Sequence, residues 1–396
     1  MKRGVAALLA ILLLLISGCW DYREIGDMQM VSGMGIEPGD KTKYRLYIEL
    51  VRTSEFVSDK RLGSSRSYVM EQEVNTIADG VTILNQKLNK HIEFSHMQLL
   101  VMDQALLSSG DLSYLDFIER YREVRNNILL VGASTGKVKS VMTTLSPDLS
   151  VSTYKIREQL QQYYRDYGGT YPIKLLHFTR ELSESGKNPV IPMVTVASQS
   201  PKGSTLDAAK ELELKDIVEL RGVGVFRAGK LVGVLNNKQY RDSMLINNKL
   251  VESALEMPCS DKSFVSLYLQ HQSSKLHARL ENRVVRLQAD VDLIARLDES
   301  QCRGYYDGSS KDYDKIESQA EELLKSKIEN IIRLLQKQYR SDIFGFGYAL
   351  RESDFKAYKE VEDEWHDRFA QAEVEVTVHV GLRRSGIRYG SIEQKN

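Results

Sequence analysis

The stretch YDKIESQAEELLKSKIENIIRLLQKQYR, residues 313–340, decides the fold of the C-terminal half of this 396-residue chain. Its apolar side chains recur at three- and four-residue spacing without a break, which is the pattern of one continuous amphipathic stripe. A helix of this length spans ~40 Å, enough to cross a whole β-sheet. The apolar positions are Ile316, Ala320, Leu323, Leu324, Ile328, Ile331, Ile332, Leu335 and Tyr339. We therefore expect a long helix over residues 313–340 that packs on a sheet.

The stretches on either side of this helix alternate between apolar and polar residues. Such alternation is typical of strands that have one buried and one solvated face. One such stretch is 287–297, another is 374–382, and a second amphipathic helix is expected at 355–370. These elements predict an antiparallel sheet with two helices on one face, which places the chain in the α+β class.

The N-terminal half mixes strands and helices. Residues 28–36 and 43–51 are strand-like runs on either side of a Pro-Gly turn, which predicts a hairpin. Residues 96–102 form a nearly continuous apolar run, as expected of a strand buried on both faces. The polar stretch 199–206 is the predicted boundary before a C-terminal α+β domain over residues 205–396.

The first nineteen residues have the three zones of a lipoprotein signal peptide. Lys2 and Arg3 precede a short apolar run that closes with Ile-Ser-Gly-Cys at residues 16–19. The run is shorter than the ~20 residues of a membrane-spanning helix, and small residues precede the cleavage point. We expect cleavage between Gly18 and Cys19, with Cys19 carrying a diacylglycerol thioether and an N-acyl chain such as palmitate. The alternative is an uncleaved anchor, or an ordinary secretory signal with a chance cysteine.

The net charge and the cysteine content restrict the classes of function that this protein can have. Removing residues 1–18 takes away two basic residues and no acidic one, so the formally neutral chain acquires a net charge of −2. This balance argues against a nucleic-acid-binding protein, which would show a basic excess. Cys259 and Cys302 are the cysteines that remain after Cys19. In a compartment that permits disulfides they either form a bridge or stay as two unrelated thiols.

Signatures of catalysis and of cofactor binding are missing from the sequence. It has no Gly-x-Ser-x-Gly elbow, no His-Glu-x-x-His helix and no phosphate-binding loop. No pair of histidines has metal-ligand spacing, and His96 is more simply a structural histidine than a ligand or base. We expect no metal, no cofactor and no enzyme activity.

A cluster of charged residues lies at the end of the predicted helix of residues 112–125. Its members are Arg120, Arg122, Glu123 and Arg125. One interpretation is that basic residues are favoured by the helix dipole. The other is a buried or interfacial lock between arginine and glutamate, which would use Arg120, Glu123 and Arg125.

The run Phe-Gly-Phe-Gly-Tyr at residues 344–348 follows the long helix directly. We expect a chain reversal in which Phe344 and Phe346 cap the core, with Gly345 at the end of the helix. The alternative is an exposed aromatic patch for a partner. The next helix carries Trp365, which we expect to be buried. The acidic residues of this helix are more simply explained as a solvated face than as a catalytic pair. They are Glu360, Glu362, Asp363 and Glu364.

Several of these segments together resemble the Ger(x)C family of spore germination lipoproteins, the C subunits of bacterial germinant receptors. Cys-Trp-Asp-Tyr-Arg-Glu-Ile at residues 19–25 resembles the opening of the family, and Met-Val-Ser-Gly-Met-Gly-Ile at 30–36 its first strand. Asp-Ile-Phe-Gly-Phe-Gly at 342–347 resembles a C-terminal signature. Residues 120–125 are similar to an Arg-Asp-Pro-Glu-Ile-Arg segment, with Tyr121 and Arg122 in place of its Asp and Pro.

The resemblance implies a non-enzymatic, lipid-anchored subunit on the outer face of the spore inner membrane. It also implies partners, which are two multi-pass membrane subunits, one transporter-like and one channel-like. The family fold implies three small domains, each a mixed or antiparallel sheet with helices. We therefore expect an N-terminal α/β domain at 19–136, a helix-rich second domain at 137–204 that shares strands with the first or stands alone, and the C-terminal domain at 205–396, with the first break near residues 136–147.

Two other functions compete with this one. A solute-binding lipoprotein of a membrane transporter would have two similar lobes and a ligand cleft with converging polar groups. An extracytoplasmic hydrolase would need a nucleophile or a metal site. The N-terminal half contains a strand-like run that is apolar throughout, whereas the strands of the C-terminal half alternate between apolar and polar residues. This difference counts against a solute-binding lipoprotein. The missing catalytic motifs count against a hydrolase.

Overall fold

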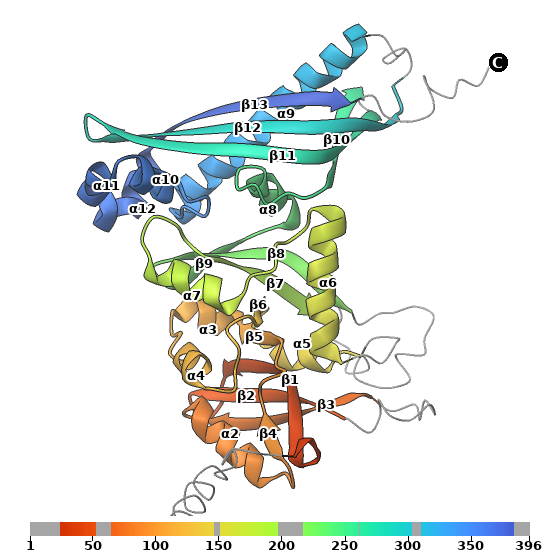
Figure 1. The fold of residues 1–396 in the computed structure, drawn as a ribbon, viewed down its shortest axis with the longest axis vertical. Coiled ribbons are helices and arrows are strands. Elements are labelled where there is room, and N and C mark those ends of the chain that lie inside the picture. Colours follow the sequence, from red (N-terminus) through yellow and green to blue (C-terminus); the bar gives the residue numbers. More distant parts are fainter. Residues whose placement is uncertain are drawn as a thin grey trace, which may run out of the picture.

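The structure is a computed structural model, and Cys19 and the predicted signal peptide lie outside the residues that it describes. The described strands form two sheets, a nine-stranded sheet at the lower end of the long axis in Figure 1 and a four-stranded sheet at the upper end. The α+β class is therefore confirmed. The described residues are 24–52, 65–145, 151–196, 217–260, 262–302 and 310–383.

The large sheet is parallel at its centre and antiparallel at its ends. Its order is β3-β2-β1-β5-β6-β7-β8-β9, and the short β4 pairs separately with β1. The central strands β1, β5, β6 and β7 run parallel to one another. A short 3-10 turn, η1 (Ile25–Asp27), precedes the first strand. The strands are β1 (Met28–Pro38), β2 (Tyr44–Val51), β3 (Ser67–Val74), β4 (His91–Glu93), β5 (Leu99–Asp103), β6 (Leu129–Ala133), β7 (Val190–Val196), β8 (Val218–Arg227) and β9 (Lys230–Leu235).

Helices cover both faces of this sheet, which is why the strands β5 and β6 at its centre are buried along their whole length. Every residue of β5 and of β6 is buried. One face packs on α5 (Val138–Thr143) and α6 (Ser152–Tyr167). The other face packs on α2 (Ile77–Gln86), α3 (Gln104–Ser109), α4 (Tyr114–Arg120) and α7 (Leu175–Ser183). Parallel strands require this arrangement because their crossover helices return over the faces.

The predicted domain boundaries do not coincide with breaks in this sheet. β6 pairs with β7 across the expected break near residues 136–147. β7 pairs with β8 across the expected boundary at 204/205, with Val190 opposite Val225. The predicted hairpin over 28–51 is confirmed as β1 and β2. The division into three domains stays a prediction.

The small sheet has the order β10-β11-β12-β13 and packs its apolar face on one long helix. That helix, α9 (Ser310–Leu334), continues into a π-helical turn, η5 (Leu335–Tyr339), in agreement with the stripe over 313–340. Between the sheets lies α8 (Asn237–Met244), whose neighbours are α9, β8 and β9. The strands are β10 (Ser253–Ser260), β11 (Ser263–Glu281), β12 (Val284–Ser300) and β13 (Glu373–Arg383).

Two expectations for the C-terminal half were wrong, and one strand was missed. β13 pairs parallel to β12, not antiparallel, because the chain returns through α9 and the following helices as a crossover. The expected helix over 355–370 is divided into α11 (Phe355–Val361), a 3-10 turn η6 (Glu362–Glu364) and α12 (Trp365–Gln371). The interruption leaves both Tyr358 and Trp365 in the core. β10 was not anticipated.

The outer edge of β13 is covered by two glutamates of α9. The backbone N–H of Val380 donates to Glu321 Oε1 at 3.0 Å, and that of Leu382 donates to Glu317 Oε1 at 2.7 Å. An uncovered edge strand presents unpaired backbone groups that pair readily with other chains. The glutamates therefore satisfy donors that the sheet itself leaves open.

Replacing both glutamates by alanine should open this edge. Hydrogen bonds to charged groups are worth about 1.5–3 kcal/mol, so amide hydrogen exchange at Val380 and Leu382 should accelerate at least tenfold in Glu317→Ala/Glu321→Ala. Glu322→Ala is the matched control, since Glu322 is exposed on the same helix. Equal exchange rates in the double variant and the control would refute the role of the two glutamates.

Candidate functional site

The segment after η5 is organised around one buried carboxylate, that of Asp342. Asp342 has no exposed surface. Its two oxygens accept four hydrogen bonds, from the backbone N–H groups of Phe344, Gly345 and Gly347 at 2.9–3.0 Å and from Trp365 Nε1 at 3.1 Å. A buried charge of this kind is tolerated only where hydrogen bonds replace its water. Asp342 thereby fixes the path of the chain up to α10 (Phe346–Ser353).

Asp342 also binds the loop before β7, which belongs to the large sheet. The N–H of Asn188 donates to the Asp342 carbonyl at 2.7 Å, and the N–H of Asp342 donates to Asn188 Oδ1 at 3.0 Å. Gly186 and Gly347 meet at the same place, where a Cβ on Gly347 would lie 2.4 Å from Gly186 Cα. Only glycine allows two backbones to approach this closely. We call this contact between residues 184–188 and 341–348 the junction.

The structure places the three predicted aromatic rings of this region in the core. Phe344, Phe346 and Trp365 are all buried, and the rings of Phe344 and Phe346 meet edge to face with centroids 5.8 Å apart. They do not form a surface patch. The expected role of Gly345 was wrong, because the long helix ends at Arg340, which has φ +50°, and Gly345 instead begins α10 with φ +94°.

A cavity of about 340 Å³ lies beside the junction, between residues 181–189 and the turn η6. Its charged walls are paired. Lys187 Nζ lies 2.7 Å from Glu181 Oε1, Ser185 donates to Glu362 at 3.0 Å, and Tyr348 donates to Glu184 at 3.0 Å. The last two of these bonds join the two halves of the chain, so these polar groups beside the cavity serve the contact between the halves.

A second buried carboxylate, that of Glu49 on β2, holds α6 on the large sheet. It accepts hydrogen bonds from the first two backbone N–H groups of α6 at 2.9 and 3.0 Å, where helix donors lack partners within the helix. A negative charge is also favoured there by the helix dipole. The full set of donors is Ser32 Oγ, Ser67 Oγ, Ser152 N, Thr153 N and Thr153 Oγ1.

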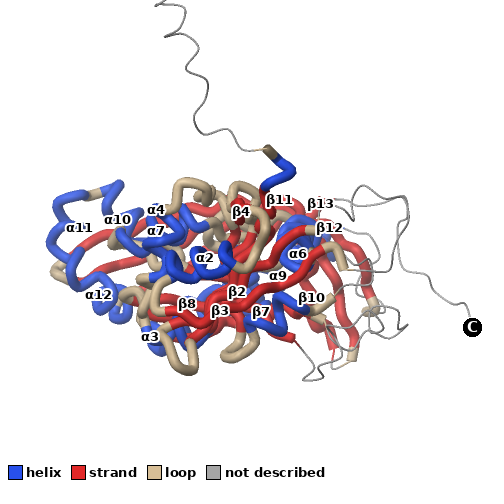
Figure 2. Tube along the Cα trace, turned by 90° about the horizontal axis from the view of Figure 1, so that it is seen from below, coloured by secondary structure: helices blue, strands red, loops and turns tan. Residues whose placement is uncertain are grey.

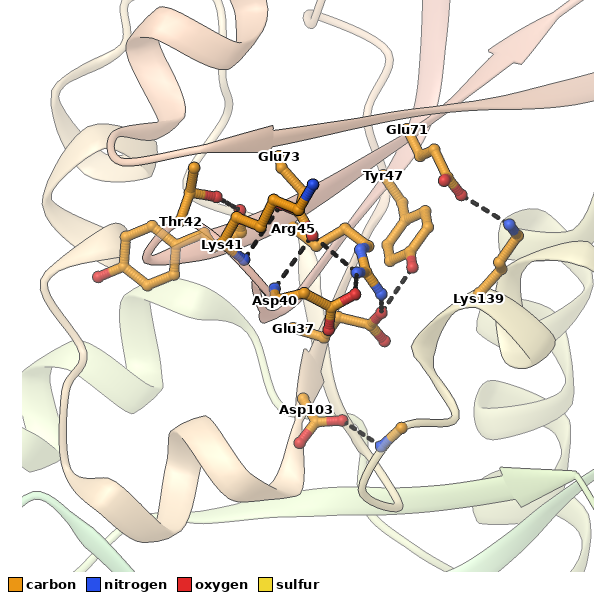
Figure 3. A network of polar contacts seen from close by, with 12 residues as sticks. Glu37, Asp40, Lys41, Thr42, Arg45, Tyr47, Glu71, Glu73, Asp103 and Lys139 are labelled. Carbon is orange, nitrogen blue, oxygen red and sulfur yellow. Dashed lines mark hydrogen bonds and ion pairs between the residues drawn. The ribbon is translucent and has the colours of Figure 1, made fainter.

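Figure 3 shows a third polar cluster, at the carboxyl ends of the parallel strands. Glu37 at the end of β1 accepts from Tyr47 at 2.6 Å and from Arg45 at 3.2 Å. Asp103 at the end of β5 accepts from the N–H groups of Ala105 and Gly136, each at 2.7 Å, and burial raises the pKa of its carboxyl. Ligands bind at this edge in many α/β sheets. Here the acids pair with neighbouring side chains or hold the loops after β5 and β6.

The predicted arginine–glutamate cluster is dispersed in the structure. Arg120 pairs with Asp116 on its own helix at 2.7 Å, and both side chains are exposed. Glu123 lies 3.5 Å from His91, on β4. Arg125 is exposed in the turn before β6.

The remaining predicted residues are placed as follows. Cys259 and Cys302 are joined in a disulfide, with Cα atoms 6.4 Å apart. Cys19 lies outside the described residues. His96 is exposed and contacts Ser95 in the turn before β5, because the strand begins at Leu99 rather than at residue 96.

The part of the chain that the structure describes contains no group of three His, Cys, Asp or Glu side chains arranged to hold a metal ion. Within the same residues, none of the helices combines the length and the apolar composition needed to cross a bilayer.

Sequence reasoning missed Glu49, Asp342 and Asn188. Glu49 and Asp342 each carried a weak signal, since each is a lone acid within an apolar stretch, Leu-Tyr-Ile-Glu-Leu-Val at 46–51 and Asp-Ile-Phe at 342–344. A charge at such a position is rarely buried without partners. Asn188 carried no comparable signal, because its partner is 154 residues away.

Two family models match the chain, and together they cover most of it. "Spore germination protein N-terminal domain" matches residues 21–196, and "Spore germination B3/ GerAC like, C-terminal" matches residues 221–386. Spore germination protein KC of Bacillus subtilis (strain 168) is 23% identical over 400 residues, covering 98% of both chains. Spore germination protein B3 of the same organism is 21% identical over 395 residues, covering 96% of both.

A solved structure has the same fold. The crystal structure of the GerBC protein superposes with a TM-score of 0.56 at 13% identity, covering 88% of this chain and 96% of that one.

Asp342 should give the protein an unusual dependence of stability on pH. Burial raises the pKa of its carboxyl to about 6 from the ordinary value of 3.8. Between these values the native state holds a proton that the unfolded state has lost, so the unfolding free energy falls as pH rises through this window. The size is about 3 kcal/mol, since each pKa unit corresponds to about 1.4 kcal/mol.

Urea denaturation of Asp342→Asn and wild type at pH 4 and pH 7 measures this effect. The stability advantage of the wild type should be about 2 kcal/mol larger at pH 4 than at pH 7, because the unfolded carboxyl is already partly ionised at pH 4. Asp363→Asn is the control, because Asp363 is exposed in η6. A wild-type advantage that stays constant or grows with pH would contradict the prediction.

Glu49→Ala should be strongly destabilising, because five donors lose their acceptor inside the core. We expect the unfolding free energy to fall by at least about 3 kcal/mol, measured by urea denaturation. Glu71→Ala is the matched control on β3, since it removes only a surface ion pair with Lys139, worth about 1 kcal/mol or less. An equal fall in unfolding free energy in the two variants would refute the role of Glu49 as a buried hydrogen-bond acceptor.

Proposed function

This chain belongs to the GerAC-like family of spore germination proteins, and on that basis we propose that it is a lipid-anchored, non-enzymatic subunit of a nutrient germinant receptor. Its relatives are germination proteins, which supports a role in germination. In the proposal, acylated Cys19 tethers the chain to the outer face of the spore inner membrane. Two multi-pass membrane subunits, one transporter-like and one channel-like, are its partners.

One observation carries the proposal beyond family membership, namely the continuity of the molecule. The large sheet runs from the region of the N-terminal family model into that of the C-terminal one. The junction then bonds the large sheet to the segment that precedes α10. A body built in this way transmits a displacement from one end to the other through the paired strands and the junction.

The mechanism that fits such a body is mechanical. A subunit that contacts its partners differently in two receptor states shifts the equilibrium by the difference in contact free energy. Coupling between the large sheet and the C-terminal sheet makes such contacts possible at both ends. The two parts of the fold are unlike, one a nine-stranded mixed sheet and the other a four-stranded sheet. This difference disfavours the solute-binding lipoprotein, whose two lobes would be similar.

Affinity purification from spore membranes tests the proposal. A C-terminally tagged wild-type chain, solubilised in mild detergent, should retain two multi-pass subunits. The Cys19→Ala variant should leave the membrane fraction and lose both of them, since the lipid that concentrates it at the bilayer is gone. Spores that carry only this variant should lose the nutrient response of the receptor.

Cys259→Ser/Cys302→Ser is the control, because it removes the two cysteines of the disulfide together, leaves Cys19 in place and should stay in the membrane fraction. If Cys19→Ala remains bound to the membrane, another anchor exists and the proposed lipidation is wrong. If the wild-type chain is recovered alone with a bound small molecule, the solute-binding alternative replaces the receptor subunit.

A further inference from the structure

A groove lies where α6 passes the first half of β8. β9 pairs with β8 only from Val223 onward, so residues 218–222 have no strand on that side within the part of the chain that the structure describes. Side chains of α6 and of the start of α8 stand there instead. The groove has a volume of about 720 Å³, which is within the range of small-molecule sites.

Two amide oxygens in the wall of this groove have no hydrogen-bond partner. Gln159 Nε2 donates to the carbonyl of Val218 at 3.2 Å, and Asn237 Nδ2 donates to that of Leu220 at 2.9 Å. These bonds fix the orientation of both amides, and they leave Gln159 Oε1 and Asn237 Oδ1 buried without a donor. Each such acceptor costs about 1–3 kcal/mol. The groove therefore lacks hydrogen-bond donors, which a ligand would supply.

Two tyrosine rings of α6 form an aromatic wall of the same groove. Tyr163 and Tyr167 lie one helical turn apart, with ring centroids 6.4 Å apart, and Tyr167 is 66% exposed. The ring of Tyr163 packs so closely on Gly169 that a Cβ there would lie 2.1 Å from it. Aromatic faces attract cations and also cover the apolar part of a ligand.

The carboxylates of the groove favour a positively charged ligand over an anion. Glu158 on α6 and Glu219 on β8 line it, both are exposed, and among the described residues neither makes an ion pair. Lys155 is the third charged residue of the lining and already has a partner. The unpartnered oxygens, the rings and the carboxylates all match one chemical group, an ammonium, which donates hydrogen bonds and carries a positive charge.

We propose that the groove between α6 and β8 binds a small organic ammonium ion with an apolar body. The ammonium donates to the amide oxygens of Gln159 and Asn237, and the apolar body lies against Tyr163 and Tyr167. Figures 1 and 2 both place α6 on the opposite side of the molecule from α10, α11 and α12. The groove is thus separate from the helices that follow the junction, and its occupation requires neither the lipid anchor nor the membrane partners.

Three indole compounds that differ only in the group at the end of the side chain test this site. The chain from residue 19 with Cys19→Ser is titrated with tryptamine, tryptophol or indole-3-propionate, and binding is followed by saturation-transfer NMR. Tryptamine should bind at least about tenfold more tightly than the neutral alcohol, because hydrogen bonds that involve a charged group are worth about 1.5–3 kcal/mol. The carboxylate should bind still more weakly than the alcohol.

Substitutions in the groove should weaken the binding of tryptamine. We expect a loss of about tenfold in Gln159→Leu, which removes one acceptor. We expect a loss of roughly threefold in Glu158→Gln/Glu219→Gln and in Tyr167→Ala, since exposed ion pairs and cation–π contacts are weaker. The exposed glutamates are also the variants that leave the core untouched, so they keep the test valid if Gln159→Leu does not fold.

Matched controls lie on the C-terminal part of the fold. Glu322→Gln/Glu360→Gln removes two exposed carboxylates, and Phe355→Ala removes an aromatic ring that is 60% exposed. Both should bind tryptamine as the unsubstituted chain does. Equal losses in the groove and control variants, equal binding of the three compounds, or no binding of tryptamine would overturn the proposal.

The outcome for this groove is independent of the outcome for the receptor subunit. A chain that binds tryptamine and also retains the two multi-pass subunits in purification supports both proposals. If tryptamine does not bind but the membrane subunits are retained, the groove proposal alone is wrong. If tryptamine binds and the wild-type chain is recovered without membrane subunits, the groove stands and the receptor subunit fails.

Discussion

Asp342 is the residue on which the arrangement of the two sheets depends, through its buried carboxylate and through its backbone. Burying a charge costs several kcal/mol unless hydrogen bonds replace the lost water. Asp342 meets this requirement with four donors from two different segments. Through Asn188 it is also bonded to the loop before β7. The carboxylate sets the path after the long helix and the position of Trp365, because none of its donors can move without leaving the charge undercompensated. The backbone of the same residue makes the contact with the large sheet.

Glu49 is a second buried carboxylate whose charge is compensated by hydrogen bonds, in the N-terminal half of the protein. Its donors come from β1, from β3 and from the first turn of α6. The Glu49 carboxylate bonds segments that lie more than one hundred residues apart in the chain, and Asp342 does the same through its backbone N–H and C=O groups. Glu49 fixes a helix on the large sheet, whereas Asp342 fixes the contact between the large sheet and the segment that follows the long helix. Hydrophobic burial stabilises both sheets, but it is not directional, whereas hydrogen bonds to a buried charge specify position.

The parts of the fold that the sequence predicts are those whose signal is local. The stripe over 313–340, the hairpin of β1 and β2 and the alternation along β12 are periodic within a few residues, so the elements follow from the pattern. Alternation carries no information about the direction of a neighbouring strand, which is why β13 was expected to be antiparallel. Glu49 and Asp342 depend on partners that are distant in the chain, and no local pattern marks those partners. Arg340 ends the long helix in a left-handed conformation that glycine adopts more readily, so Gly345 was the better expectation from sequence alone.

The parallel pairing of β12 and β13 has a consequence for how the protein folds. The chain leaves β12 at Ser300 and returns only at Glu373, after the long helix and the shorter helices that follow it. Such a non-local contact forms late, because a long loop must close before the pairing is gained. A chain is synthesised from its N-terminus, so β13 is made after every other described strand. The apolar face of the small sheet then depends on a segment that arrives last, and until that moment β12 offers an open edge to any neighbouring polypeptide.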